Sequence, residues 1–164
     1  MKQKLLPLLL ALSLLLTGCG STTSAPTAAV ETTAPLEILT VFSPNENADG
    51  FVKTDIAVPA ITDAVIIQQL VNVGVLAEDT SVSTVMEVST DTGKATLEAD
   101  FNDALRQSLL PMGTAGEYVL MGSVVNTFLT AYQADAITIT VEGEVLETGH
   151  SVYDQPLTFY PENP

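Results

Sequence analysis

Residues 1–19 place the strongest constraint on the chain, because they divide it into a leader and a part that can fold. Lys2 and Lys4 precede an apolar core over residues 5–16. This core is about twelve residues long, short of the roughly 20 that a helix needs to cross a bilayer. A basic start, a short apolar core and small residues at its end are typical of an export signal. We therefore expect residues 1–18 to be a cleaved signal peptide.

The leader ends in Leu16-Thr17-Gly18-Cys19, which contains the only cysteine of the chain. This pattern resembles the bacterial lipobox, in which the cysteine sulfur receives a diacylglyceryl group and the cysteine becomes the new N-terminus. The alternative is an ordinary secreted protein with a chance cysteine near its cleavage site. Each methylene buried in the membrane contributes about 0.8 kcal/mol. Two or three acyl chains such as palmitate would therefore keep the protein at the membrane, where a single myristoyl chain would not. The prediction is lipidation at Cys19 and a lipid-anchored protein on the outer, extracytoplasmic face of the cell membrane.

Composition limits what the mature chain can be. Without the 18 leader residues, 146 of the 164 remain, enough for one domain with a core. They carry three cations against 20 acidic residues, a formal charge of −17. This charge argues against nucleic acid as a partner, because phosphate binding needs clustered cations. With Cys19 acylated, no thiol remains for a disulfide or for thiolate chemistry.

The mature chain divides again near residue 35. Ser, Thr, Pro and Ala dominate residues 20–35. Such a segment buries too little apolar surface to offset the entropy of ordering. We expect residues 19–35 to be the lipidated cysteine with a disordered tether, and residues 36–164 to form one domain.

Hydrophobic periodicity predicts the elements of this domain. Strands are expected over residues 36–42, 52–58, 82–88, 94–101, 137–141 and 145–146. Helices are expected over residues 62–73, 102–109 and 117–133, with a breaker at 111–116. The last helix should pack one stripe, from Tyr118 to Tyr132, on a sheet. This order indicates an α+β fold, a small mixed sheet with two main helices packed on one face.

Five segments stand out along residues 39–161. They are Val41-Phe42 with the Asp49-Gly50 loop, Leu97-Glu98-Ala99-Asp100-Phe101, Val125-Asn126-Thr127-Phe128-Leu129, residues 137–143, and the tail from Glu147-Thr148-Gly149-His150 to Pro156-Leu157. In this order they resemble the GerMN domain, named for a spore germination and sporulation protein of endospore-forming bacteria.

The resemblance implies an extracytoplasmic module, often on lipoproteins, with roles in sporulation, germination and envelope assembly. It brings no catalytic constellation, so we expect a non-enzymatic binding or assembly module with an envelope or sporulation protein as partner. Because cell-wall amidase domains accompany some relatives, a small peptidoglycan-active hydrolase is the alternative. A solute-binding lipoprotein is a further alternative, which the short length and the lack of tryptophan disfavour.

The candidate catalytic and metal-binding residues are each better explained by a structural role. His150 is the only histidine, and its neighbour Ser151 does not make a triad, so a turn or packing role is expected. Residues 45–50 mimic the start of a calcium loop, but Ile56 stands where the closing glutamate should be. Neither a cofactor nor a metal is predicted.

The acidic residues offer two further candidates. The pairs Asp100 with Asp103 and Glu142 with Glu144 are read as solvated surface. Strand alternation also places a polar set on one sheet face, which a partner or another copy of the chain could bind. The predicted partner face comprises Thr96, Glu98, Thr138 and Thr140, with Lys94, Asp100 and Glu142 on the same side. The alternative is that this face is simply hydrated.

Overall fold

A computed structural model describes residues 35–161. The predicted leader, Cys19 and nearly all of the predicted tether lie outside the described residues. The elements in chain order are β1 (Glu37–Pro44), β2 (Phe51–Val58), α1 (Asp63–Asn72), β3 (Val82–Val88), β4 (Ala95–Phe101), α2 (Ala104–Leu109), α3 (Thr114–Tyr132), β5 (Ala136–Val141), β6 (Glu144–Glu147) and β7 (Val152–Tyr153).

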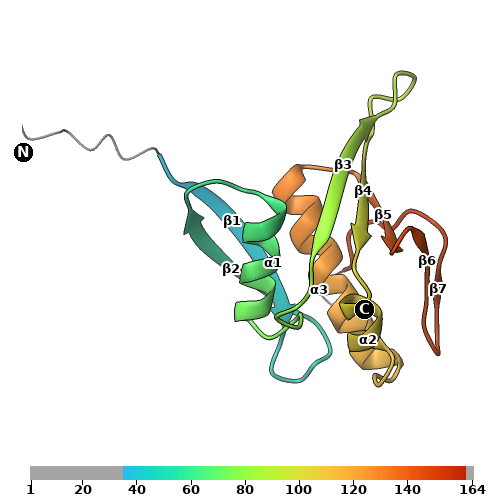
Figure 1. Cartoon of the computed structure of the whole chain (residues 1–164). Helices are drawn as coiled ribbons and strands as arrows, with labels where there is room; N and C mark the ends of the chain where they lie inside the picture. The colour runs from blue at the N-terminus through green and yellow to red at the C-terminus, as the bar shows by residue number, and fades with distance from the viewer. Residues whose placement is uncertain (1–34, 162–164) are drawn as a thin grey trace, which may run out of the picture. The chain divides into compact units, whose positions relative to one another are not determined.

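The strands divide between two sheets (Figure 1). β1 and β2 form an antiparallel hairpin, while the other five strands form a sheet in the order β3-β4-β5-β6-β7. In that sheet β4 and β5 are parallel and the other neighbours antiparallel. The predicted α+β class and the mixed sheet are confirmed, but β1 and β2 form a separate sheet.

The strands predicted over residues 82–88 and 94–101 are confirmed and pair as an antiparallel hairpin, β3–β4, with Val82 opposite Phe101 and Val88 opposite Ala95. Gly93, with φ at +69°, supplies the left-handed turn conformation that glycine adopts without steric cost. The apolar side of β4 is buried at Leu97, Ala99 and Phe101. Its other side is therefore left for polar residues.

The helix predicted over residues 62–73 is also confirmed, as α1, and both of its ends are capped. The Thr62 hydroxyl accepts a hydrogen bond from the Val65 N–H, and Gly74 follows the last turn with φ at +76°. Asp63, in the first turn, accepts hydrogen bonds from the Thr84 N–H (3.1 Å), the Thr84 hydroxyl (2.8 Å) and the Tyr132 hydroxyl. One carboxylate therefore ties α1 to β3 and to α3.

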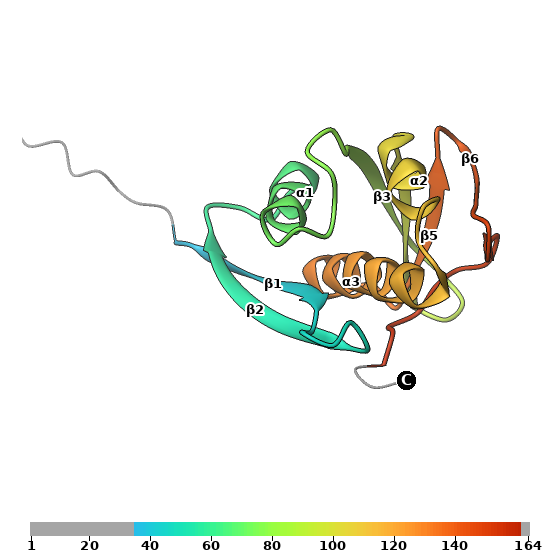
Figure 2. The same ribbon diagram turned by 90° about the horizontal axis from the view of Figure 1, so that it is seen from below.

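Helix α3 lies between the β1–β2 hairpin and the five-stranded sheet (Figure 2). Every residue from Val119 to Leu129 is buried. The prediction that α3 packs a single stripe on a sheet is wrong, because the helix also packs against β1, where Thr127, outside the predicted stripe, accepts the Phe42 N–H. The helix is the centre of the core, with Met121, Val124 and Phe128 fully buried.

The predicted start of this helix needs correction. Residues 111–116 were expected to be a breaker, but α3 begins at Thr114, so Gly116 lies inside the helix. Gly113 occupies the N-cap position with an extended backbone. The interruption between α2 and α3 is therefore short, from Leu110 to Gly113.

Burial of the middle of α3, from Val119 to Leu129, requires partners for its polar side chains. The Ser123 hydroxyl donates to the Val119 carbonyl, and the Thr127 hydroxyl donates to the Ser123 carbonyl. Thr127 also accepts the Phe42 N–H of β1 at 2.9 Å. The helix thus pairs with the backbone of β1 through a side chain.

The C-terminal segment packs back on the domain. Leu157 forms an antiparallel bridge with Ile137, and Asn126 of α3 holds Tyr160 by two bonds. The Asn126 amide donates to the Tyr160 carbonyl (3.0 Å) and accepts from the Tyr160 N–H (2.8 Å). No helix of residues 35–161 is long and apolar enough to span a membrane.

Candidate partner-binding face

The five-stranded sheet has a polar side opposite its buried apolar side. Cross-strand register sets Glu98 between Val85 and Thr138, and Asp100 between Ser83 and Thr140. Glu87 lies opposite Thr96 one pair further along. We call this surface the open face, and it comprises Ser83, Val85, Glu87, Thr96, Glu98, Asp100, Thr138 and Thr140.

All four residues of the predicted partner face lie on the open face. Glu98 is exposed, while Thr96, Thr138 and Thr140 are half-buried between neighbouring strands. Ser83, Val85 and Glu87 of β3 belong to the same surface and were not predicted. The alternation of residues 82–88 could have revealed them, because residues that lie opposite each other on neighbouring strands share a face of the sheet.

The open face is hollowed only slightly. A depression of about 290 Å³ is lined by Ser83, Val85, Glu98, Ala99, Asp100 and the two threonines of β5. Small-molecule sites are usually enclosed, mostly apolar cavities of roughly 300–1,000 Å³. This surface is better suited to carboxylate and hydroxyl contacts with the surface of a protein.

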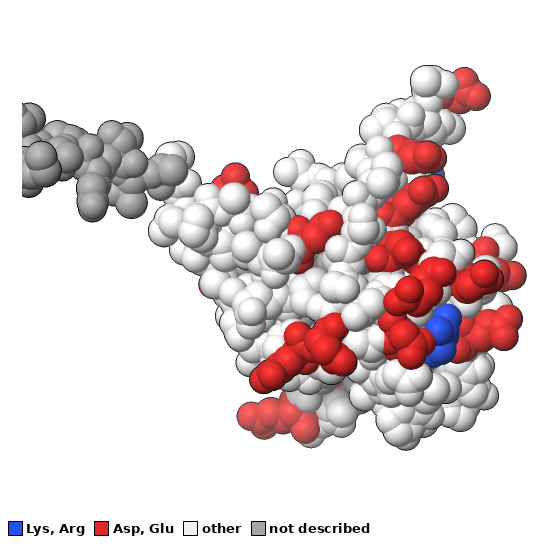
Figure 3. All heavy atoms as spheres, viewed as in Figure 1, with Lys and Arg blue, Asp and Glu red and all other residues white. Residues whose placement is uncertain are grey.

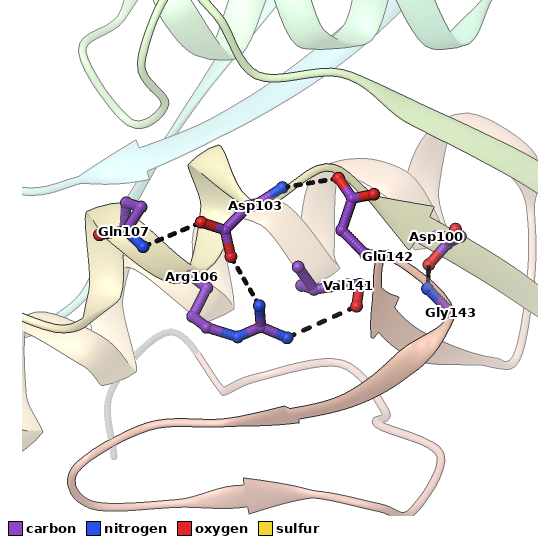
Figure 4. Close-up of polar contacts among 7 residues, drawn as sticks. All are labelled: Asp100, Asp103, Arg106, Gln107, Val141, Glu142 and Gly143. Atoms are coloured by element: carbon purple, nitrogen blue, oxygen red, sulfur yellow. Dashed lines mark hydrogen bonds and ion pairs between the residues drawn. The ribbon is translucent and has the colours of Figure 1, made fainter.

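The carboxyl ends of β4 and β5 carry three carboxylates, Asp100, Asp103 and Glu142, which we call the acidic rim (Figure 4). Asp100 accepts hydrogen bonds from the Thr140 hydroxyl (2.6 Å) and the Gly143 N–H (2.8 Å). These bonds, that from Thr140 above all, lower the pKa of Asp100. Asp100 thereby fixes the β5–β6 turn while remaining an anion.

Asp103, in the same rim, accepts from the Gln107 amide (2.9 Å) and from Arg106 (2.6 Å), and both bonds lower its pKa. Arg106 forms the ion pair with Asp103 and also reaches the Val141 carbonyl at 3.5 Å. Glu142 accepts the Asp103 N–H at 3.2 Å.

These contacts bear on whether Asp100 and Asp103 form a catalytic carboxylate pair or a solvated acidic surface. A general acid for glycoside cleavage needs a raised pKa, whereas both of these groups have lowered values. The arrangement therefore supplies fixed negative charge. Figure 3 shows acidic side chains spread along this side of the molecule, with few basic ones among them.

His150 lies in the turn between β6 and β7. Its Nε2 is 3.2 Å from the Met112 carbonyl, and its N–H donates to the Thr148 hydroxyl. The Ser151 N–H donates to the same hydroxyl at 3.0 Å. The histidine and serine thus take part in closing a turn, as the packing interpretation expected.

Glu117 is the functional-looking residue that the sequence did not reveal. Its side chain is only 2% exposed and lies in the first turn of α3. Burial opposes ionisation, but hydrogen bonds from Tyr153, Ser151 and Thr148 hold the Glu117 pKa below its ordinary value. Because its acceptor atoms are occupied by residues of the β6–β7 hairpin, Glu117 joins that hairpin to α3.

The calcium-like segment forms the β1–β2 loop. The Asn45 amide donates to Asp49 (2.8 Å), and Asn45 accepts the Asp49 N–H (3.1 Å). Ile56, at the closing position, lies in β2 and packs against the core. In residues 35–161, no three His, Cys, Asp or Glu side chains are grouped so that they could hold a metal ion.

The lipobox residues Leu16, Thr17, Gly18 and Cys19 lie outside the described part of the chain.

Comparison with known proteins identifies the fold. No protein-family model matches the chain, and no curated protein matches it. The structure resembles the tandem GerMN domains of the sporulation protein GerM from Bacillus subtilis, with a TM-score of 0.56 and 16% sequence identity. The match covers 84% of this chain and 49% of the GerM chain, so the chain spans about half the length of that structure.

Two other solved structures are similar at lower scores. The first GerMN domain of the same GerM protein has a TM-score of 0.45 and 15% identity, covering 77% of this chain and 96% of that one. A candidate lipoprotein from Clostridium perfringens has a TM-score of 0.41 and 13% identity, covering 76% and 88% of the two chains. The fold is GerMN-like, as the sequence pattern predicted.

Proposed function

We propose that this chain, whose described residues have a GerMN-like fold, is a lipid-anchored extracytoplasmic module that binds and assembles proteins of sporulation, germination or cell-envelope complexes. In this proposal it has no enzymatic activity of its own. The anchor is Cys19, on the outer face of the cell membrane, and the partner is a protein with a basic surface.

The open face is the observation that carries the proposal. Glu87, Glu98 and Asp100 follow one another across β3 and β4, and the threonines of β5 add hydroxyl groups between them. With 20 acidic residues against five basic ones in the chain, long-range attraction favours a cationic partner. Since such attraction is screened by salt, binding should weaken as ionic strength rises.

The anchor is tested by metabolic labelling with radioactive palmitate. We expect label on the wild-type protein, none on Cys19→Ala, and loss of that variant from the membrane fraction. A wild-type protein that stays unlabelled, or that accumulates in the medium, would overturn the anchored location.

The partner face is tested by photo-crosslinking in growing and in sporulating cells. We expect a crosslinker at Thr96 or Thr138 to give the same discrete adduct, and one at Gln68, exposed on α1, to give none. Glu98→Lys should reduce the adduct at least about tenfold, which corresponds to 1.4 kcal/mol. Glu46→Lys, an equal charge change in the β1–β2 loop, should leave it unchanged. Equal adducts from all three positions would contradict the proposal.

A further inference from the structure

The outer edge of β3 is left without a strand partner. β3 is the first strand of the five-stranded sheet and pairs only with β4. The Thr84 N–H points away from β4, because it donates to Asp63 of α1. Backbone groups alternate in direction along an antiparallel strand, so the N–H groups of Met86 and Val88 point the same way. Among residues 35–161, no hydrogen bond from outside the sheet reaches either of these amides.

The two halves of this edge differ. Near Thr84 the Asp63 carboxylate covers the edge, which is one way in which natural proteins block unwanted strand pairing. Beyond it the hairpin continues to its turn, clear of the helices (Figure 1). Val85 is 58% exposed and Val88 61% exposed, with Met86 between them at 37%. Three apolar side chains and two unpaired amides therefore occupy the outer half of one edge strand.

The charge near the outer edge of β3 determines which kind of strand could pair with it. Glu87 lies on the open face of β3, and Glu98 is the neighbour of Val85 on β4. A second copy of this chain would bring like charge to the same place, because the chain has a formal charge of −15. A segment with Lys or Arg on the side of the open face would instead be attracted.

We infer that residues 85–88 of β3 accept an extended basic segment of another protein as an added strand of the sheet. Its backbone would pair with the amides of Met86 and Val88, which is the usual source of affinity in strand addition. Basic side chains would face Glu87 and Glu98, and apolar ones would cover Met86 and Val88. This inference rests on the proposed function, since it states how the module holds its partner.

The test uses the full-length protein in detergent and a capped ten-residue peptide of alternating Lys and Val. We expect the peptide to slow hydrogen exchange at Met86 and Val88 at least about tenfold, with little change at Val85, whose amide already faces β4. A peptide of alternating Glu and Val should leave all three amides unaffected. Protection elsewhere in the domain, or equal protection by both peptides, would overturn the inference.

Two sets of variants separate backbone pairing from general attraction. Met86→Pro removes one outward N–H at an edge position, where proline is tolerated, and should weaken peptide binding at least about tenfold. Met86→Ala keeps that N–H and should retain most of the binding. Glu87→Lys should weaken binding, and Glu46→Lys should not.

Chemically altered peptides leave the protein itself unchanged. N-methylation of either all Lys or all Val amides removes the donors from one edge of the peptide strand. We expect one methylated peptide to lose binding and the other to keep it. Equal behaviour of the two would exclude strand addition. If both bind equally while the crosslinks from Thr96 and Thr138 persist in cells, only this inference fails, and the proposed function stands.

Discussion

The hydroxyl of Tyr153 donates a 2.7 Å hydrogen bond to the buried carboxylate of Glu117, which joins the last short strand to the first turn of the central helix. Thr148 donates to the same carboxylate at 2.9 Å. Glu117 therefore holds the β6–β7 hairpin, the part of the five-stranded sheet that is furthest from β3.

This arrangement predicts a specific dependence of stability on pH. Because the folded pKa of Glu117 lies below its ordinary value of 4.5, the ionised carboxylate stabilises the domain above that value. The contribution should disappear as the pH falls through the lower, folded pKa. Glu117→Gln should cost about 2 kcal/mol at pH 7 and progressively less as the pH falls below 4.5.

Urea denaturation of both proteins at several pH values measures this difference. Glu144→Gln, at an exposed position in β6, is the matched control and should change stability little at any pH. A gap between Glu117→Gln and wild type that stays constant from pH 7 to pH 3 would contradict the assigned role.

Gly122 and Gly116 should respond oppositely to the same substitution. A Cβ at Gly122 would lie 2.2 Å from the Phe51 ring, whereas one at Gly116 would meet Met112 at an ordinary 3.4 Å. We expect Gly122→Ala to destabilise the domain by about 1–3 kcal/mol through overpacking. Gly116→Ala should stabilise it by up to about 1 kcal/mol, because alanine favours a helix. Combining Gly122→Ala with Phe51→Ala should remove the two closest contacts and leave only Tyr160, at 3.1 Å. Thermal unfolding of the wild type, the three single variants and this double variant tests both expectations.

Asn126 should control how firmly the C-terminal segment is held. Asn126→Ala removes both of its bonds to the Tyr160 backbone and should cost about 2–3 kcal/mol. Hydrogen exchange at the Tyr160 amide should accelerate more than exchange in β4. Asn47→Ala, in the exposed β1–β2 loop, is the control. Unchanged exchange at Tyr160 would show that packing of Phe159 and Tyr160 alone is sufficient.

Thr127 should matter for its oxygen and not for its shape. Thr127→Val keeps the volume but leaves the Phe42 N–H without its acceptor, so we expect a loss of about 1–3 kcal/mol. Thr127→Ser keeps the oxygen and should lose less. Chemical denaturation compares the two variants. A loss from Thr127→Ser, which removes only the methyl group, that equals or exceeds the loss from Thr127→Val would contradict the role assigned to the oxygen.

The local sequence pattern predicted most of the elements, because the periodicity of a strand or a helix depends only on residues close together in the chain. The alternation that ends at Leu97, Ala99 and Phe101 fixed the hairpin and the side of β4 that is buried. The same rule placed Thr96, Glu98, Thr138 and Thr140 on one face. It was not applied to β3, so Ser83, Val85 and Glu87 were missed.

Other features could not be predicted from the local sequence, because they depend on residues far apart in the chain. Asn126 and Thr127 look like surface residues of a helix, yet they are buried because β1 and the C-terminal segment supply backbone partners from far along the chain. Glu117 looks like one acidic residue among 20 until Tyr153 and Thr148 are placed beside it. The separation of β1 and β2 into their own sheet likewise depends on long-range packing against α3.

The position of β1 has a mechanical consequence. A pull along the chain from its N-terminal side would enter the domain at β1, which is paired with β2 along its whole length and joined to α3 through Phe42 and Thr127. Leu39 and Val41 of this strand are fully buried. The strand cannot peel away without opening the core, so tension would be resisted by the packing of the core and by the whole β1–β2 ladder at once.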